Sequence, residues 1–168
     1  MMSEAAQAPQ EQPKKEPYTY YDSAKTLHNV EMYLRKYNED KDLKEQIRAS
    51  RVPILLRIYR LAILKHNKKS KDVKTITTQR RDDEGNSYTF KTLGFVTKEQ
   101  SIATHLQCNP KTIQRSLKVL TGEVAKRANV APPALLERFE TSCYGLTLLL
   151  NPAFLVPSGR KEKDLESV

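Results

Sequence analysis

The pattern of hydrophobic and polar positions first takes a helical period at Ser23, a residue able to cap a helix. Four of the apolar residues that follow share one helical stripe: Leu27, Val30, Leu34 and Tyr37. Asn38–Asp40 interrupt the stripe, and Leu43 and Ile47 then predict a second short helix. An amphipathic helix needs apolar cover for its stripe, and the pattern allows two kinds of cover: the rest of this chain or a dimer partner.

The most apolar part of the chain is Arg51–Leu64, RVPILLRIYRLAIL, in which apolar residues cover well over half of the helical circumference. Pro53 suits the first turn of a helix, because its missing N–H would have no partner there. This pattern predicts the central helix of the core. A basic linker, Lys65–Lys71, follows it.

A β-hairpin is predicted next, over Val73–Arg81 and Ser87–Phe95, because both segments are rich in β-branched and aromatic residues. The turn signal between them is Asp82–Asn86, where Gly85 and Asn86 follow acidic turn formers. Four basic residues lie on the flanks of this hairpin: Lys74, Arg80, Arg81 and Lys91. The hairpin therefore adds a basic β element to a chain that is otherwise mainly helical in pattern.

Two short helices separated by a three-residue break are predicted after the hairpin. Thr97 and Gln100 have the spacing of a capping box at the start of the first helix. The inward face of this helix holds Ile102, Ala103 and Leu106, and Ala103 is small enough for a second helix to cross closely. The break, Gln107-Cys108-Asn109, comes directly after this face.

The second helix has a strong cap in Asn109, with Pro110 at its first position. Its apolar residues recur at i, i+4 and i+7: Ile113, Leu117 and Leu120. Its polar residues cover the remaining surface: Lys111, Thr112, Gln114, Arg115 and Lys118. Two short helices joined by such a tight turn have the outline of a helix-turn-helix.

The segment TKEQSIATHLQCNPKTIQRSLKVL, Thr97–Leu120, resembles the helix-turn-helix of winged-helix DNA-binding proteins without a gap. Residues of both helices and of the turn match the family pattern: Ile102, Ala103, Leu106, Cys108, Asn109, Thr112, Ile113, Arg115, Leu117 and Leu120. One position departs from it, because the family commonly has glycine in the turn where this chain has Gln107, and a left-handed backbone strains glutamine. The resemblance implies a winged-helix fold with double-stranded DNA as its partner.

A wing is implied to follow the second helix. The candidate wing strands are Phe139–Thr141 and Leu146–Pro152, and LTLLLNP resembles the last wing strand of proteins of plasmid and phage replication or control. About twenty residues that a minimal winged helix lacks separate Leu120 from this hairpin. They echo a helix-turn-helix pattern, but Pro132-Pro133 restrict its second helix, so we interpret residues 121–138 as an extra helix leading to the wing.

Charge strengthens the case for a polyanionic partner. The formal net charge is +9, the isoelectric point is near 9.5, and no acidic residue occurs from Cys108 through Gly122. Each Lys or Arg that meets a phosphate releases a condensed counterion, so such an excess favours nucleic acid. A solvated helix face is the plainer interpretation of these residues, and the shape of the motif argues against it.

Within the second helix, Gln114 and Arg115 are the candidates for base readout, because Arg bonds guanine edges and Gln bonds adenine bidentately. Lys118 is expected to meet the phosphate backbone and Lys111 either target, while Thr112 suits a phosphate at the helix start. The candidate DNA-binding residues are Thr97, Asn109, Lys111, Thr112, Gln114, Arg115, Lys118, Arg80 and Arg81.

Other classes of function find little support in the residues. Cys108 and Cys143 are far apart in sequence and the three histidines are scattered, so we expect neither a metal site nor a cofactor. Relaxases and recombinases use a tyrosine nucleophile, and YTYYD, residues 18–22, contains three tyrosines. The metal-binding histidines or the Arg and His residues that such enzymes also need cannot be assembled from this sequence, so we do not expect an enzyme. No apolar run approaches the roughly 20 residues of a membrane span and no secretory signal is visible, which favours a cytoplasmic location.

We therefore expect a mainly α fold with a small β component: a winged helix-turn-helix with an additional β-hairpin and N-terminal helices. The expected organisation is a disordered arm over 1–17, helices over 18–50 as the candidate dimer element, the DNA-binding domain over 51–157 and a charged tail over 158–168. The expected function is sequence-specific regulation of transcription by a homodimer, through a recognition helix at 110–120. One rival is replication initiation or segregation of a plasmid or mobile element, and a rival of another class is a winged-helix protein–protein adaptor.

Overall fold

The computed structural model describes residues 17–142 and 145–159, so the predicted N-terminal arm and charged tail fall almost wholly outside the described residues. The helices are α1 (Ser23–Glu39), α2 (Val52–Asn67), α3 (Glu99–Leu106), α4 (Pro110–Leu120) and α5 (Glu123–Arg127), with short 3₁₀ helices η1 (Ala49–Arg51) and η2 (Pro152–Phe154). The strands are β1 (Val73–Arg81), β2 (Ser87–Thr97), β3 (Leu136–Ser142) and β4 (Gly145–Leu150). The fold is therefore mixed α/β, with a larger β component than the sequence pattern indicated.

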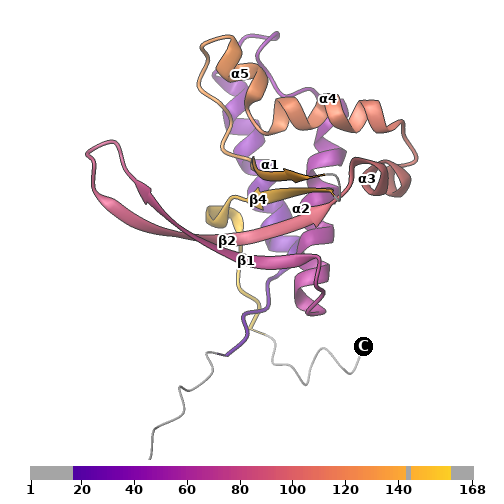
Figure 1. Ribbon diagram of the computed structural model, residues 1–168. Coiled ribbons are helices and arrows are strands. Elements are labelled where there is room, and N and C mark those ends of the chain that lie inside the picture. The colour runs from indigo at the N-terminus through magenta and orange to yellow at the C-terminus, as the bar shows by residue number, and fades with distance from the viewer. Residues whose placement is uncertain (1–16, 143–144, 160–168) are drawn as a thin grey trace, which may run out of the picture.

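The four strands form one antiparallel sheet in the order β1-β2-β4-β3. Alternate residues of β4 point to opposite faces of the sheet: Leu146, Leu148 and Leu150 belong to the hydrophobic core beneath the helices, and Thr147 and Leu149 lie on the other face. Figure 1 shows the far end of the β1–β2 hairpin extending beyond the helices and the other two strands.

Helix α2 is the centre of the core, as the apolar pattern predicted. Pro53 lies in its first turn, and Leu55, Ile58 and Tyr59 have no exposed surface. Burying a side chain of this size stabilises the fold by roughly 1.5–3 kcal/mol. The helix runs to Asn67, so the predicted basic linker from Lys65 begins inside the helix.

Tyr59 joins α2 to both ends of the β3–β4 hairpin. Its hydroxyl donates to the carbonyl oxygen of Leu135, just before β3, at 2.5 Å, and accepts from the N–H of Asn151, just after β4, at 2.9 Å. Burial raises the pKa of Tyr59 far above its usual range, so the hydroxyl keeps its proton and its role as a donor. One buried side chain thus fixes where the hairpin sits against the helices.

Helix α1 packs on α2 inside the chain, so this chain itself covers part of the apolar stripe. Thr26, Val30 and Leu34 are buried, so this part of the stripe is not free for a dimer partner. The predicted cap at Ser23 is wrong: Asp22 caps the helix, its carboxylate accepting from the N–H of Lys25 at 3.0 Å.

The second short helix predicted at Leu43–Ile47 does not form. The segment folds into turns held by Asn38, whose side-chain oxygen accepts from the N–H of Ile47 at 2.8 Å and whose amide donates to the Ile47 carbonyl at 3.1 Å. Ile47 is buried, whereas Leu43 is 84% exposed. So short a helix is costly to nucleate, and side-chain bonds to the backbone offer this segment an alternative.

The predicted β1–β2 hairpin is confirmed, with continuous pairing from Val73 opposite Phe95 to Arg81 opposite Ser87. Asp82 closes the turn, because its carboxylate accepts from the N–H groups of both Glu84 and Asn86. This hairpin, rather than the later one, is the β element that projects.

The candidate wing strands form the predicted second hairpin, as β3 and β4 of the sheet. Strand β4 lies between β2 and β3 and is buried from Leu146 to Leu150. Its first residues pair beside the end of β2, Leu146 opposite Thr97, and the connecting residues 143–144 lie outside the described part of the chain. The β3–β4 hairpin therefore supplies two of the four strands of the sheet.

Candidate nucleic-acid interface

Helices α3 and α4 are the two halves of the predicted helix-turn-helix. Helix α3 begins one residue later than predicted, because Thr97 is still paired with Leu146 in the sheet and its backbone is extended. Lys98 takes the cap position without a side-chain bond, so the predicted capping box of Thr97 and Gln100 is wrong. Sheet pairing here overrides a local capping signal.

The turn between the two helices is held by backbone hydrogen bonds at the end of α3. Gln107 has the left-handed backbone that the comparison with glycine-containing turns implied, with φ 54° and ψ 45°. The N–H of Cys108 donates to the carbonyl of Ala103 at 3.0 Å, and that of Gln107 to Thr104 at 3.3 Å, which is a Schellman arrangement. These bonds offset the roughly 1–2 kcal/mol that a left-handed residue with a Cβ costs.

Helix α4 starts as predicted. The side-chain oxygen of Asn109 accepts from the N–H of Lys111 at 2.9 Å, and Pro110 occupies the first helical position. The inward face is fully buried at Ile113, Leu117 and Leu120. The cap and this apolar face together fix which side of α4 remains in contact with solvent.

The outer side of α4 carries the predicted DNA contacts. Lys111, Thr112, Gln114 and Arg115 are exposed and Lys118 is half-buried. Lys111, Gln114, Arg115 and Lys118 are spaced i, i+3, i+4 and i+7, so they lie along one side of the helix. None of these four side chains has an ion pair or hydrogen bond with the described residues, and α4 contains no acidic residue. We call this set the α4 face.

Thr97 and the two arginines of the β1–β2 hairpin do not share the environment of the α4 face. Thr97 is half-buried at the strand–helix junction. The guanidinium of Arg80 lies 3.7 Å from the centre of the Phe90 ring, and its Nη2 is 2.9 Å from both carboxylate oxygens of Glu137. Arg81 is exposed. The charge of Arg80 is therefore balanced inside the chain, whereas that of Arg81 faces solvent.

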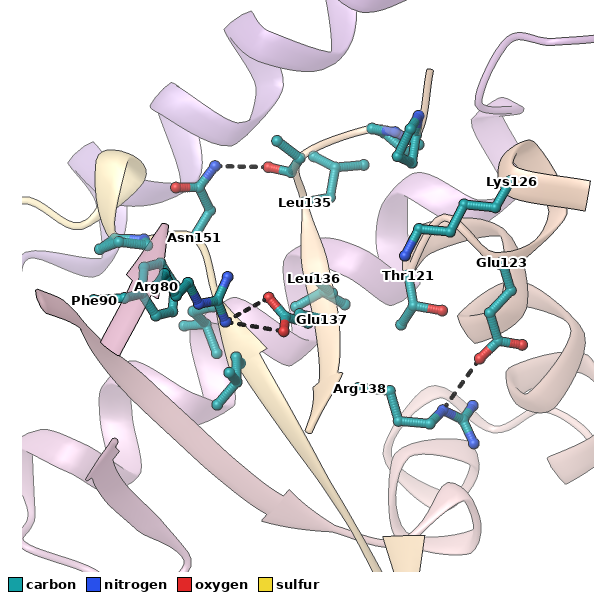
Figure 2. A pocket seen from close by; sticks show the side chains of 16 residues that line it. Arg80, Phe90, Thr121, Glu123, Lys126, Leu135, Leu136, Glu137, Arg138 and Asn151 are labelled. Atoms are coloured by element: carbon teal, nitrogen blue, oxygen red, sulfur yellow. Dashed lines mark hydrogen bonds and ion pairs between the residues drawn. The ribbon is translucent and has the colours of Figure 1, made fainter. Parts of the chain in front are cut away.

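The Arg80–Glu137 pair borders a groove of about 530 Å³, shown in Figure 2, that runs past β3 to the end of α4. On the far side of β3, Arg138 Nε lies 3.5 Å from Glu123 Oε1. Each arginine of the groove thus faces a glutamate, whereas Lys126 has no carboxylate partner among the described residues. Glu137 was missed by the sequence reasoning, because no local pattern links residues 57 positions apart.

The N-terminal tyrosines anchor their segment to the end of α2. The Tyr18 hydroxyl donates to the His66 carbonyl at 2.5 Å and lies 3.1 Å from His66 Nδ1, and His66 Nε2 is 2.7 Å from the carbonyl of Thr19. Burial raises the pKa of Tyr18, which makes it a poorer nucleophile, and burial lowers the pKa of His66. These contacts tie the N-terminal segment to the end of α2.

Within the described ranges, no three His, Cys, Asp or Glu side chains gather in a group able to hold a metal ion. Among the same residues, no helix combines the length and the apolar character needed to cross a bilayer. Comparison with known proteins adds no relative: no family model, no curated protein and no solved structure matches the chain.

Proposed function

We propose that this chain binds double-stranded DNA in a sequence-specific manner, with α4 as the recognition helix of a winged helix-turn-helix, and that it regulates transcription. The observation that carries the proposal is the α4 face: three cations and a glutamine on one side of a helix, with no counterion among the described residues. A helix in the major groove needs donors of this kind aimed at base edges and phosphates.

The position of these residues within α4 supports a division of roles. In a helix-turn-helix, the N-terminal part of the second helix contacts the bases. Gln114 and Arg115 lie in the first two turns of α4, and we assign base readout to them. Lys118, one turn further on, is assigned to the phosphate backbone, and Lys111 and Thr112 to phosphates at the helix start.

Arg80 is not part of the proposed interface, because a phosphate would have to displace Glu137 from a bidentate contact. Thr97 is likewise set aside, since its backbone is in the sheet and its side chain is half-buried. Asn109 contributes by capping α4 rather than by touching DNA. Arg81 remains a candidate phosphate contact on the hairpin.

The experiment is fluorescence anisotropy of a labelled random-sequence duplex over a series of salt concentrations. Each phosphate contact adds about 0.9 to the slope of log affinity against log salt. We expect Lys118→Ala to reduce the slope by about 1, and Arg35→Ala, which removes an exposed cation on α1, to leave it unchanged. Affinity that does not respond to salt would overturn DNA binding and favour a protein–protein adaptor.

The proposed regulatory role has its own test. A promoter–reporter fusion carrying a sequence selected by the protein should change its output when the protein is expressed, and Arg115→Ala should abolish the change. A selected site that alters replication or inheritance of the DNA instead of reporter output would refute the regulatory role and leave DNA binding intact.

A further inference from the structure

Strand β1 forms an open edge of the sheet. It pairs with β2 along all nine of its residues, and no described strand lies on its other side. The strand contains no proline, its pairing shows no register shift, and its centre is the β-branched run Thr75–Thr78. Such an edge is able to accept another strand, and it lacks the bulge or proline that commonly prevents this.

The hydrogen-bond pattern identifies which backbone groups face the open edge. The N–H of Val96 donates to the carbonyl of Asp72 at 2.7 Å, so even-numbered residues of this strand direct their backbone groups toward β2. Odd-numbered residues then direct theirs outward, and the N–H of Val73 does turn away from β2, to the carbonyl of Ser70. Thr75, Thr77 and Gln79 therefore present N–H and C=O groups at the open edge.

The two ends of β1 carry opposite charges. The residues before it include Lys68, Lys69 and Lys71, and the turn after it begins Asp82-Asp83-Glu84. Lys71 and Asp83 are exposed, and neither has an ion pair with another described residue. An antiparallel partner of the same sequence would place the basic end of one copy beside the acidic end of the other.

We propose that β1 pairs with β1 of a second copy, antiparallel about a two-fold axis at Thr77, to give a dimer with a continuous eight-stranded sheet. Odd residues then face odd residues, Thr75 opposite the partner's Gln79, and exchange the outward N–H and C=O groups. The same register brings Lys71 level with the partner's Asp83. Because the open edge of β1 and its flanking charges are complementary to themselves, a two-fold contact forms every hydrogen bond and ion pair twice, once in each direction.

Two pairs of like charges also meet in this register, and in each pair one residue is already bound to an opposite charge within its own chain. Lys74 falls opposite the partner's Arg80, but each Arg80 is bound by a Glu137 carboxylate. Asp72 falls opposite the partner's Asp82, but each Asp72 is bound by Lys65 Nζ at 2.7 Å. Lys71 and Asp83, which have no ion pair with another described residue, each meet a residue of opposite charge.

The test is sedimentation velocity of the full chain without DNA, so its outcome does not depend on DNA binding. We expect a dimer, and we expect Lys71→Glu or Asp83→Lys alone to weaken dimerisation roughly ten-fold, since each substitution turns the two attractive pairs of the dimer into repulsive ones. The double variant, K71E with D83K, should restore it. Lys44→Glu, a charge reversal on an exposed turn remote in sequence from β1, is the matched control.

An equimolar mixture of the two single variants gives a second readout. Both contacts of the mixed dimer then join a lysine to a carboxylate. The mixture should therefore dimerise as tightly as the wild type, whereas each variant alone should dimerise more weakly. Circular dichroism checks that every variant is folded. A monomeric wild-type chain well above micromolar concentration, or a dimer that both single variants leave unchanged, would overturn the proposal.

Discussion

Replacing Tyr59 with phenylalanine tests whether one hydroxyl fixes the β3–β4 hairpin to the helices. The ring stays, so the packing of α2 is retained and only the hydrogen bonds are lost. The carbonyl of Leu135, a residue 1% exposed, would lose its 2.5 Å partner, and the N–H of Asn151 would lose its 2.9 Å partner. A buried polar group left unpaired costs about 1–3 kcal/mol, so Tyr59→Phe should destabilise the chain by about 2–4 kcal/mol.

Urea denaturation followed by circular dichroism measures this loss as a lower midpoint at an unchanged slope. Tyr88→Phe is the matched control, because Tyr88 is 45% exposed on the projecting hairpin and its change should stay within about 0.5 kcal/mol. If Tyr59→Phe also stays within that range, the hydroxyl does not hold the hairpin and the account of the core is wrong.

Two further predictions concern the turn and the N-terminal segment. Gln107→Gly should raise the free energy of unfolding by about 0.5–1 kcal/mol, because glycine adopts φ 54° without the steric cost of a Cβ. This gain is reduced by the larger chain entropy that glycine loses on folding. A lower urea midpoint for Gln107→Gly would refute the prediction. The pKa of His66 is lowered by burial, so the unfolded chain binds a proton more readily than the folded one. Stability should be complete above the unfolded pKa of about 6.5 and fall as the pH drops below it, and His66→Gln should flatten that dependence in thermal melts, with His28→Gln as the exposed control. If the stability of His66→Gln depends on pH as strongly as that of the wild type, His66 is not the residue responsible for the pH dependence.

The parts of the fold that the sequence predicted well are those specified by neighbouring residues. Helix α2 follows from a continuous apolar pattern, the β1–β2 hairpin from its turn, and α4 from Asn109 and Pro110 at its start. The left-handed residue at Gln107 was also predictable, since a turn of this length between two helices requires one. In each case the signal and the structure lie within a few residues of one another.

The errors arose where distant residues decide the local structure. Thr97 has the spacing of a cap, but pairing with Leu146 keeps it in the sheet. The Leu43–Ile47 segment has helical spacing, but Asn38 bonds its backbone instead. Of the candidate site residues on α4, four are exposed and Lys118 is half-buried. Arg80 instead contacts Glu137, which spacing in the sequence alone cannot reveal.

The central claim is that the α4 face reads DNA sequence, and selection from a random duplex pool tests it most directly. The wild-type chain should enrich a defined sequence, and Gln114→Ala and Arg115→Ala should each relax the preference at one or two positions, with a loss of about 1–3 kcal/mol for the bidentate contact. Arg35→Ala on α1 should enrich the same sequence as the wild type. A pool that shows no enrichment, or an enriched sequence that both α4 variants select unchanged, would contradict the claim.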